Sequence, residues 1–198
     1  MIVKPNPLQG LIAAAAKGTP VTGTVAKHKA RTDAAERPAS LRVVVADVSW
    51  SMSESAGAST KIALLREALP GQLFDKLIAF ATRPVEVATA EQLPPPCGST
   101  ALHLALDHAA TWSPGRTLVI SDGQPDNETE ALAVAERISG VIDTLYVGPE
   151  NDAAAIAFMR KLARSGSGRC ATNDLRRTGG AQLRHGIATM LLPPGRTR

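Results

Sequence analysis

Several residue types are scarce in this sequence of 198 residues. Aromatic residues make up only 3% of it, so a hydrophobic core must be built mainly from Ala, Val and Leu. Its two cysteines, Cys97 and Cys170, are too few for a disulfide scaffold, and a reduced, cytoplasmic protein is the default expectation. No run approaches the roughly 20 apolar residues that a membrane-spanning helix needs, so we expect no membrane partner.

Two common catalytic motifs are also missing. The sequence has no Gly-x-Ser-x-Gly elbow, which is typical of serine hydrolases. It has no Gly-x-x-x-x-Gly-Lys-Ser/Thr phosphate loop either, which is typical of nucleotide hydrolases. Neither of these two enzyme classes is therefore supported by a motif.

The net charge of +4 is unevenly distributed along the chain. Residues 1–40 carry six basic and two acidic residues, whereas the rest of the chain carries 16 of each. We therefore expect a basic N-terminal arm over 1–40, either flexible or bound to a partner, and a short basic tail over 193–198. Such an arm suits nucleic acid or an acidic protein surface, and a solvated linker is the plainer alternative.

Between the arm and the tail, strand and helix patterns alternate. The apolar runs and turn signals predict strands at 41–47, 76–81, 85–87, 116–121, 141–147 and 169–172, and helices at 60–69, 101–112, 128–138, 152–164 and 178–191. The segment 48–59 is predicted to be a polar loop. This alternation is typical of one α/β domain, over 41–192, with a doubly wound, Rossmann-like parallel sheet between helices.

Oxygen-bearing side chains follow the predicted strands at the edge where their carboxyl ends meet. Asp47, Ser49 and Ser51 leave the first strand, Asp122 ends another, and Thr100 opens a helix after a Gly-Ser turn. Because binding sites in open α/β sheets form at this edge, we expect the five to converge on one crevice. Carboxylates and hydroxyls are hard ligands that suit Mg²⁺, with Mn²⁺ or Ca²⁺ as alternatives. A serine-rich turn, with Asp47 capping a helix, is the structural alternative.

The same five positions resemble the metal-ion-dependent adhesion site of the von Willebrand factor type A family. That site reads Asp-x-Ser-x-Ser, then a distant Thr and a distant Asp, as in Asp47-Val48-Ser49-Trp50-Ser51, Thr100 and Asp122. The resemblance covers about 41–190 and implies a mostly parallel six-stranded sheet. It also implies that Ser49, Ser51 and Thr100 bind Mg²⁺ directly, and that Asp47 and Asp122 often act through water.

Two positions depart from the family pattern without removing a ligand. Many relatives have Gly where this chain has Trp50, and Gly-Gly-Thr where it has Gly98-Ser99-Thr100. We expect Trp50, which lies between two candidate ligands, to be largely exposed beside the metal. There it would act as an aromatic anchor for a partner, because Trp is enriched in interface hot spots. Packing back onto Met52 or the loop 94–97 is the alternative.

The resemblance implies a non-enzymatic module that binds the Asp or Glu of a partner protein through the metal. Trp50, Gln124 and Asp126 are the expected partner-binding residues on its rim. Relatives of the bacterial type often work beside AAA+ ATPases, so such an ATPase is an expected partner.

The first alternative is a structural part of a larger assembly that contacts neighbours or nucleic acid through the basic arm. The second is a metal-dependent phosphoryl hydrolase with Asp47 as nucleophile, which is disfavoured because no general base or phosphate-clamping lysine is evident near the motif.

Overall fold

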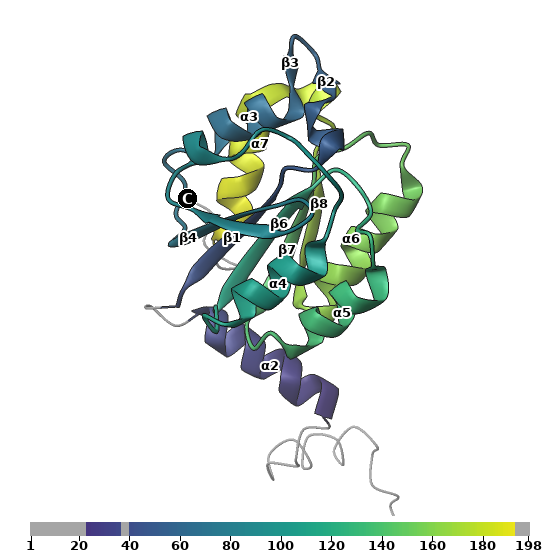
Figure 1. Ribbon diagram of the computed structural model, residues 1–198. Helices are drawn as coiled ribbons and strands as arrows, with labels where there is room; N and C mark the ends of the chain where they lie inside the picture. Colours follow the sequence, from purple (N-terminus) through teal and green to yellow (C-terminus); the bar gives the residue numbers. More distant parts are fainter. Residues whose placement is uncertain (1–22, 37–39, 193–198) are drawn as a thin grey trace, which may run out of the picture.

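The centre of the computed structural model, which describes residues 23–36 and 40–192, is a six-stranded sheet (Figure 1). Its strands are β1 (Arg42–Asp47), β4 (Lys76–Phe80), β5 (Pro84–Val87), β6 (Arg116–Ser121), β7 (Val141–Tyr146) and β8 (Ser167–Thr172). They lie in the order β5-β4-β1-β6-β7-β8, and all neighbours are parallel except β4 and β5. The predicted mostly parallel α/β sheet is confirmed.

Strand β1 is buried on both faces, as its unbroken apolar run predicts. Val44 and Ala46 belong to the core on one face of the sheet, and Val43 and Val45 belong to the core on the other. Since a parallel strand covered on both faces has no solvent side, its residues need no polar alternation. The first polar residue after the apolar run, Asp47, therefore marks the carboxyl end of β1.

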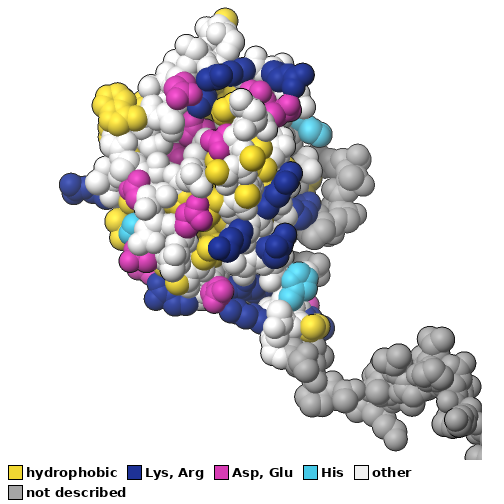
Figure 2. All heavy atoms as spheres, turned by 90° about the vertical axis from the view of Figure 1, so that its right-hand side faces the viewer, with side chains coloured by type: hydrophobic (Ala, Val, Ile, Leu, Met, Phe, Trp, Pro, Cys, Tyr) yellow, Lys and Arg dark blue, Asp and Glu magenta, His cyan; other side chains and the backbone are white. Residues whose placement is uncertain are grey.

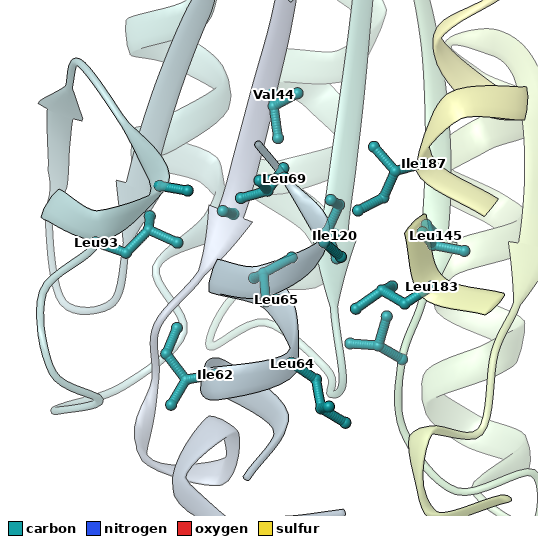
Figure 3. Close-up of a cluster of buried hydrophobic side chains, with 14 of the residues drawn as sticks. Val44, Ile62, Leu64, Leu65, Leu69, Leu93, Ile120, Leu145, Leu183 and Ile187 are labelled. Carbon is teal, nitrogen blue, oxygen red and sulfur yellow. The ribbon is translucent and has the colours of Figure 1, made fainter. Parts of the chain in front are cut away.

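Helices cover both faces of the sheet. Those on one face are α3 (Lys61–Ala68) and α7 (Leu175–Leu191), and those on the other are α4 (Leu102–Ala110), α5 (Glu128–Arg137) and α6 (Ala153–Ser165). Figure 3 shows the first of these cores, where Leu65, Leu183 and Ile187 cluster around Ile120 of β6. None of the helices within the described ranges is long and apolar enough to cross a membrane.

The segment predicted as a polar loop, 48–59, contains more structure than expected. It holds a 3-10 helix, η1 (Trp50–Ser53), and a hairpin of two very short strands, β2 (Ser55–Ala56) and β3 (Ser59–Thr60). A second 3-10 helix, η2 (Ala90–Gln92), precedes the proline-rich loop. The β2–β3 hairpin sets the start of α3, because Thr60 caps that helix by accepting the N–H of Ala63.

The last helix begins earlier than the predicted 178. Asp174 accepts the N–H of Arg176 at 3.0 Å and so caps α7, which begins at Leu175. The helix then kinks at Gly179, which has a φ of 68°, a conformation that glycine adopts without strain. The predicted start at 178 therefore lies beside the kink, and the prediction describes the part of α7 that follows it.

Helix α2 (Gly23–Glu36) lies within the predicted basic arm, at the end of the sheet opposite the β2–β3 hairpin (Figure 1). Its Arg31 is only 2% exposed and donates to the carbonyls of Ala135, Glu136 and Ser165. These carbonyls belong to the last turns of α5 and α6, where helices leave acceptors unpaired. One guanidinium thus attaches α2 to two helix ends. Residues 1–22 and 37–39 of the predicted arm, and the predicted tail, lie outside the described residues.

A buried ion pair joins β6 to β7 inside the sheet. Arg116 is 3% exposed and donates to Asp143, which is fully buried. The other oxygen of Asp143 accepts the N–H of Arg169, from β8, at 2.7 Å. This carboxylate therefore connects three neighbouring strands.

Candidate metal site

The predicted site lies where β1 and β6 end side by side in the middle of the sheet. From β1 the sheet continues through β4 on one side and through β6 and β7 on the other. This arrangement is a topological switch point, the place where open α/β sheets form ligand crevices. Asp47 is the last residue of β1, and Asp122 follows directly after β6.

Asp47 is fully buried and held by two hydrogen bonds. Its Oδ1 accepts the N–H of Ser49 at 2.7 Å, and its Oδ2 accepts the hydroxyl of Ser121 at 2.6 Å. Burial raises the pKa of Asp47 to about 6, although these hydrogen bonds from Ser121 and Ser49 act in the opposite direction. The carboxylate of Asp47 is therefore kept in an environment that disfavours its charge, which a bound cation would relieve.

The two serines of the motif connect Asp47 to Asp122. The hydroxyl oxygens of Ser49 and Ser51 lie 3.1 Å apart, and Ser51 donates to Asp122 Oδ1 at 2.7 Å. Asp47, Ser49, Ser51 and Asp122 thus form one hydrogen-bonded set, which we call the serine–aspartate network. Four of the five predicted ligands are brought together by it.

The fifth predicted ligand, Thr100, is tied to the site through its main chain. Its N–H donates to Asp126 Oδ1 at 3.0 Å, and its carbonyl accepts the N–H of Asp126. The turn before Thr100 contacts the segment that carries Ser49 and Ser51, since the N–H of Trp50 donates to the carbonyl of Gly98. Gly98 has a φ of 66°, and a side chain there would collide with Thr82. The direct hydroxyl contact that the resemblance implies for Thr100 stays a prediction.

The three residues predicted to form the rim are exposed at this end of the molecule. Trp50 is 65% exposed, as expected, while its neighbour Met52 is fully buried. Gln124 donates to Glu128 at 2.9 Å, and Asp126 is occupied by the N–H of Thr100. Trp50 is therefore the largest apolar surface offered beside the network, and Asp126 also has a structural role.

Lys61 is the site residue that sequence reasoning missed. It is only 2% exposed, and its Nζ donates to Asp122 Oδ2 at 2.5 Å and to Glu54 Oε2 at 2.8 Å. Burial alone would lower the pKa of Lys61, but the bonds to Asp122 and Glu54 together hold it above its ordinary value. A lysine therefore does lie beside the motif, but its ammonium is bonded to two carboxylates, so the expectation that no lysine there clamps a phosphate stays a prediction.

A signal for Lys61 was present in the sequence. It is the first residue of α3, directly after the cap Thr60. The positive end of the helix dipole disfavours a cation at this position, so a lysine there calls for a nearby carboxylate. Glu54 and Asp122 provide two.

The donor set fits a small divalent cation. Within the described residues no three His, Cys, Asp or Glu side chains gather around one point, so the site depends on serine hydroxyls as well as on Asp47 and Asp122. Octahedral coordination at about 2.0–2.1 Å places neighbouring ligand oxygens about 3 Å apart. The two oxygen–oxygen separations along the network, 3.1 and 2.7 Å, are close to this spacing. All donors are hard oxygens, as Mg²⁺ and Mn²⁺ prefer.

Comparison with known proteins supports the fold. No protein-family model matches the sequence, and no curated protein matches it. Among solved structures, the chain is similar to the crystal structure of manganese-loaded TRAP protein from Plasmodium vivax, with a TM-score of 0.55. The match has 14% sequence identity and covers 78% of this chain and 72% of that chain. At this identity the likeness concerns the fold alone, and that fold is like that of von Willebrand factor type A domains.

Proposed function

We propose that this protein is a non-enzymatic interaction module that binds a carboxylate of a partner protein through a divalent cation. Mg²⁺ is the expected ion, with Mn²⁺ or Ca²⁺ as alternatives. The observation that carries the proposal is the serine–aspartate network, which gathers hard oxygens at the switch point of the sheet. The manganese-loaded state of the structurally similar TRAP protein adds support for a divalent cation.

The residues divide into those that hold the ion and those that meet the partner. Ser49, Ser51 and Thr100 would bind the ion directly, while Asp47 and Asp122 would hold it through water. A bound ion would supply a Lewis-acidic position to which an Asp or Glu can attach. Trp50, exposed beside the network, would anchor the partner through its indole ring, because Trp contributes strongly to interface hot spots.

Two serines of the same loop allow a matched test. Ser51→Ala removes a member of the network, whereas Ser53→Ala removes an exposed hydroxyl that donates to the carbonyl of Trp50. We expect Mg²⁺ to bind to the wild type and to Ser53→Ala in calorimetric titration, and at least about tenfold more weakly to Ser51→Ala. Equal affinity in all three proteins would contradict the proposal.

Partner binding gives the second readout of the same proposal. Candidate partners include an AAA+ ATPase that presents an exposed Asp or Glu. We expect capture of such a partner in Mg²⁺ and its release by EDTA, with Ser53→Ala behaving as the wild type. Capture that survives EDTA would show that binding does not pass through a cation.

The hydrolase alternative needs a separate test because Lys61 lies near the motif. The ammonium of Lys61 is buried and already bonded to Asp122 and Glu54, which leaves it poorly placed to clamp a phosphate. We therefore expect no turnover of p-nitrophenyl phosphate in Mg²⁺. Turnover that disappears in Asp47→Asn would favour the enzyme instead.

A second candidate function rests on a basic surface away from the site. The exposed side of α6 carries Arg160, Lys161 and Arg164, and α2 adds Lys27. Figure 2, which faces the α5–α6 side, shows several Lys and Arg side chains gathered there. This surface suits an acidic neighbour or nucleic acid, although, apart from Lys27, it lies outside the basic arm over 1–40 that the structural alternative names. Binding to duplex DNA that falls steeply with salt, and that is lost when the three α6 residues become Ala, would favour it.

A further inference from the structure

The charge balance of the candidate site depends on Lys61. Asp47 and Asp122 together carry two negative charges, which would neutralise a divalent ion. The buried ammonium of Lys61, 2.5 Å from Asp122 Oδ2, adds one positive charge to this set. With the ion in place, the set would therefore hold one positive charge in excess.

Glu54 does not remove this excess. Its carboxylate accepts from Lys61 at 2.8 Å, but its side chain is 50% exposed and it also lies 3.5 Å from Arg176. Water screens an exposed charge, and Arg176 offsets the charge of Glu54. The positive charge of Lys61 thus acts mainly on Asp122, whose side chain is fully buried.

We propose that Lys61 is a specificity-determining residue that makes the site select a carboxylate ligand. Its ammonium competes with a divalent cation for Asp122 and so weakens cation binding by the protein alone. It also leaves the excess positive charge that an Asp or Glu from outside neutralises. The proposal rests on the divalent-cation function proposed above and names the residue that determines its selection of a carboxylate.

Three substitutions isolate the charge of Lys61. Lys61→Met keeps the apolar stem without the charge, and Lys61→Gln keeps a hydrogen-bond donor without the charge. Lys76→Met is the matched control. Lys76 begins β4, at the amino ends of the parallel strands and away from the candidate site, and it pairs there with Glu86. All three variants lower the net charge by one, so general electrostatic effects are equal among them.

The first measurement is the affinity for Mn²⁺, by calorimetry at constant ionic strength in chloride. We expect both Lys61 variants to bind Mn²⁺ at least tenfold more tightly than the wild type, and Lys76→Met to match the wild type. Even at the dielectric constant of water, a unit positive charge within about 6 Å of a divalent ion weakens the affinity for that ion about tenfold. If Lys61→Met does not fold, Lys61→Gln carries the test. Unchanged or weaker binding by the folded variants would overturn the proposal.

The second measurement replaces chloride by acetate, a minimal carboxylate. We expect acetate to tighten Mn²⁺ binding by the wild type and by Lys76→Met, and to have little effect on the Lys61 variants. An acetate effect of equal size in all the proteins would overturn the selection role of Lys61 and leave the cation site itself intact. Absence of Mn²⁺ binding in every protein, the wild type included, would instead overturn the proposed function.

Discussion

Replacing Asp47 with Asn should stabilise the metal-free protein at neutral pH, although it alters a candidate metal ligand. Burial raises the pKa of Asp47 from 3.8 to about 6. The folded state thus holds this proton more tightly than the unfolded chain does. Asp47 therefore contributes stability that is fully present below about pH 4 and is lost as the pH rises through about 6. A difference of about two pKa units corresponds to about 3 kcal/mol in the free energy of unfolding.

The geometry around Asp47 accommodates the amide. The Asn carbonyl can accept the N–H of Ser49, as Asp47 Oδ1 does at 2.7 Å, and the amide can donate to Ser121 Oγ. The hydroxyl of Ser121, which donates to Asp47 Oδ2 in the wild type, can then donate to the carbonyl of Gly123, 3.4 Å away. Since each of these polar groups keeps a partner, we expect the substitution to raise the free energy of unfolding by most of this amount, about 3 kcal/mol.

Urea unfolding in EDTA measures this effect directly. We expect Asp47→Asn to be more stable than the wild type by about 3 kcal/mol at about pH 7.5, with the difference shrinking toward pH 4. Other titrating groups are common to both proteins, so the difference between them isolates position 47. Mg²⁺ should then stabilise only the wild type. An Asn variant that is less stable than the wild type in EDTA, or a difference independent of pH, would refute the reasoning.

Three further predictions concern other parts of the molecule. Arg116→Met should lower the free energy of unfolding by about 3–5 kcal/mol, because Asp143 becomes a buried charge without its main partner. The added change Asp143→Leu should restore part of this loss in urea unfolding, since it removes the unpaired charge but leaves the N–H of Arg169 without its acceptor. A single-variant loss below about 1 kcal/mol would contradict the pair's importance. Trp50→Ala should change stability by no more than about 0.5 kcal/mol yet weaken metal-dependent partner capture by about tenfold or more. Arg31→Met should cost about 2 kcal/mol and speed hydrogen exchange in α2, since three carbonyls at the ends of α5 and α6 lose their donor. Unchanged exchange would argue against that anchor.

The sheet was predictable because its strands are unbroken apolar runs that end in a charge or a turn. Strand β6 has the predicted bounds, and β1 begins one residue later than predicted. The same strand ends identified the candidate site, since Asp47 and Asp122 are the first acidic residues beyond buried runs. Their meeting through Ser49 and Ser51 follows from the strand order, which places β1 beside β6.

The residues that escaped prediction are cations whose side chains fold inward. Lys61 follows the polar pair Ser59-Thr60, and Arg31 lies in a mostly polar helix, where a lysine or arginine is usually solvated. Each is about 2% exposed, because a distant segment supplies its acceptors: Asp122 for Lys61, and the ends of α5 and α6 for Arg31. Periodicity describes which face of an element is apolar, and it carries no information about a long side chain that reaches past its own element.

The position of α2 means that the molecule can be engaged at two ends at once. Arg31 fastens α2 to the ends of α5 and α6, while the serine–aspartate network lies at the carboxyl ends of β1 and β6. Figure 1 shows α2 at the end of the sheet opposite the β2–β3 hairpin, which follows β1. A partner held through α2 and a ligand held at the proposed metal site would therefore not compete for space. In such a bivalent arrangement the first attachment raises the effective concentration of the second, so even weak recognition at the metal edge would suffice to bridge two larger structures.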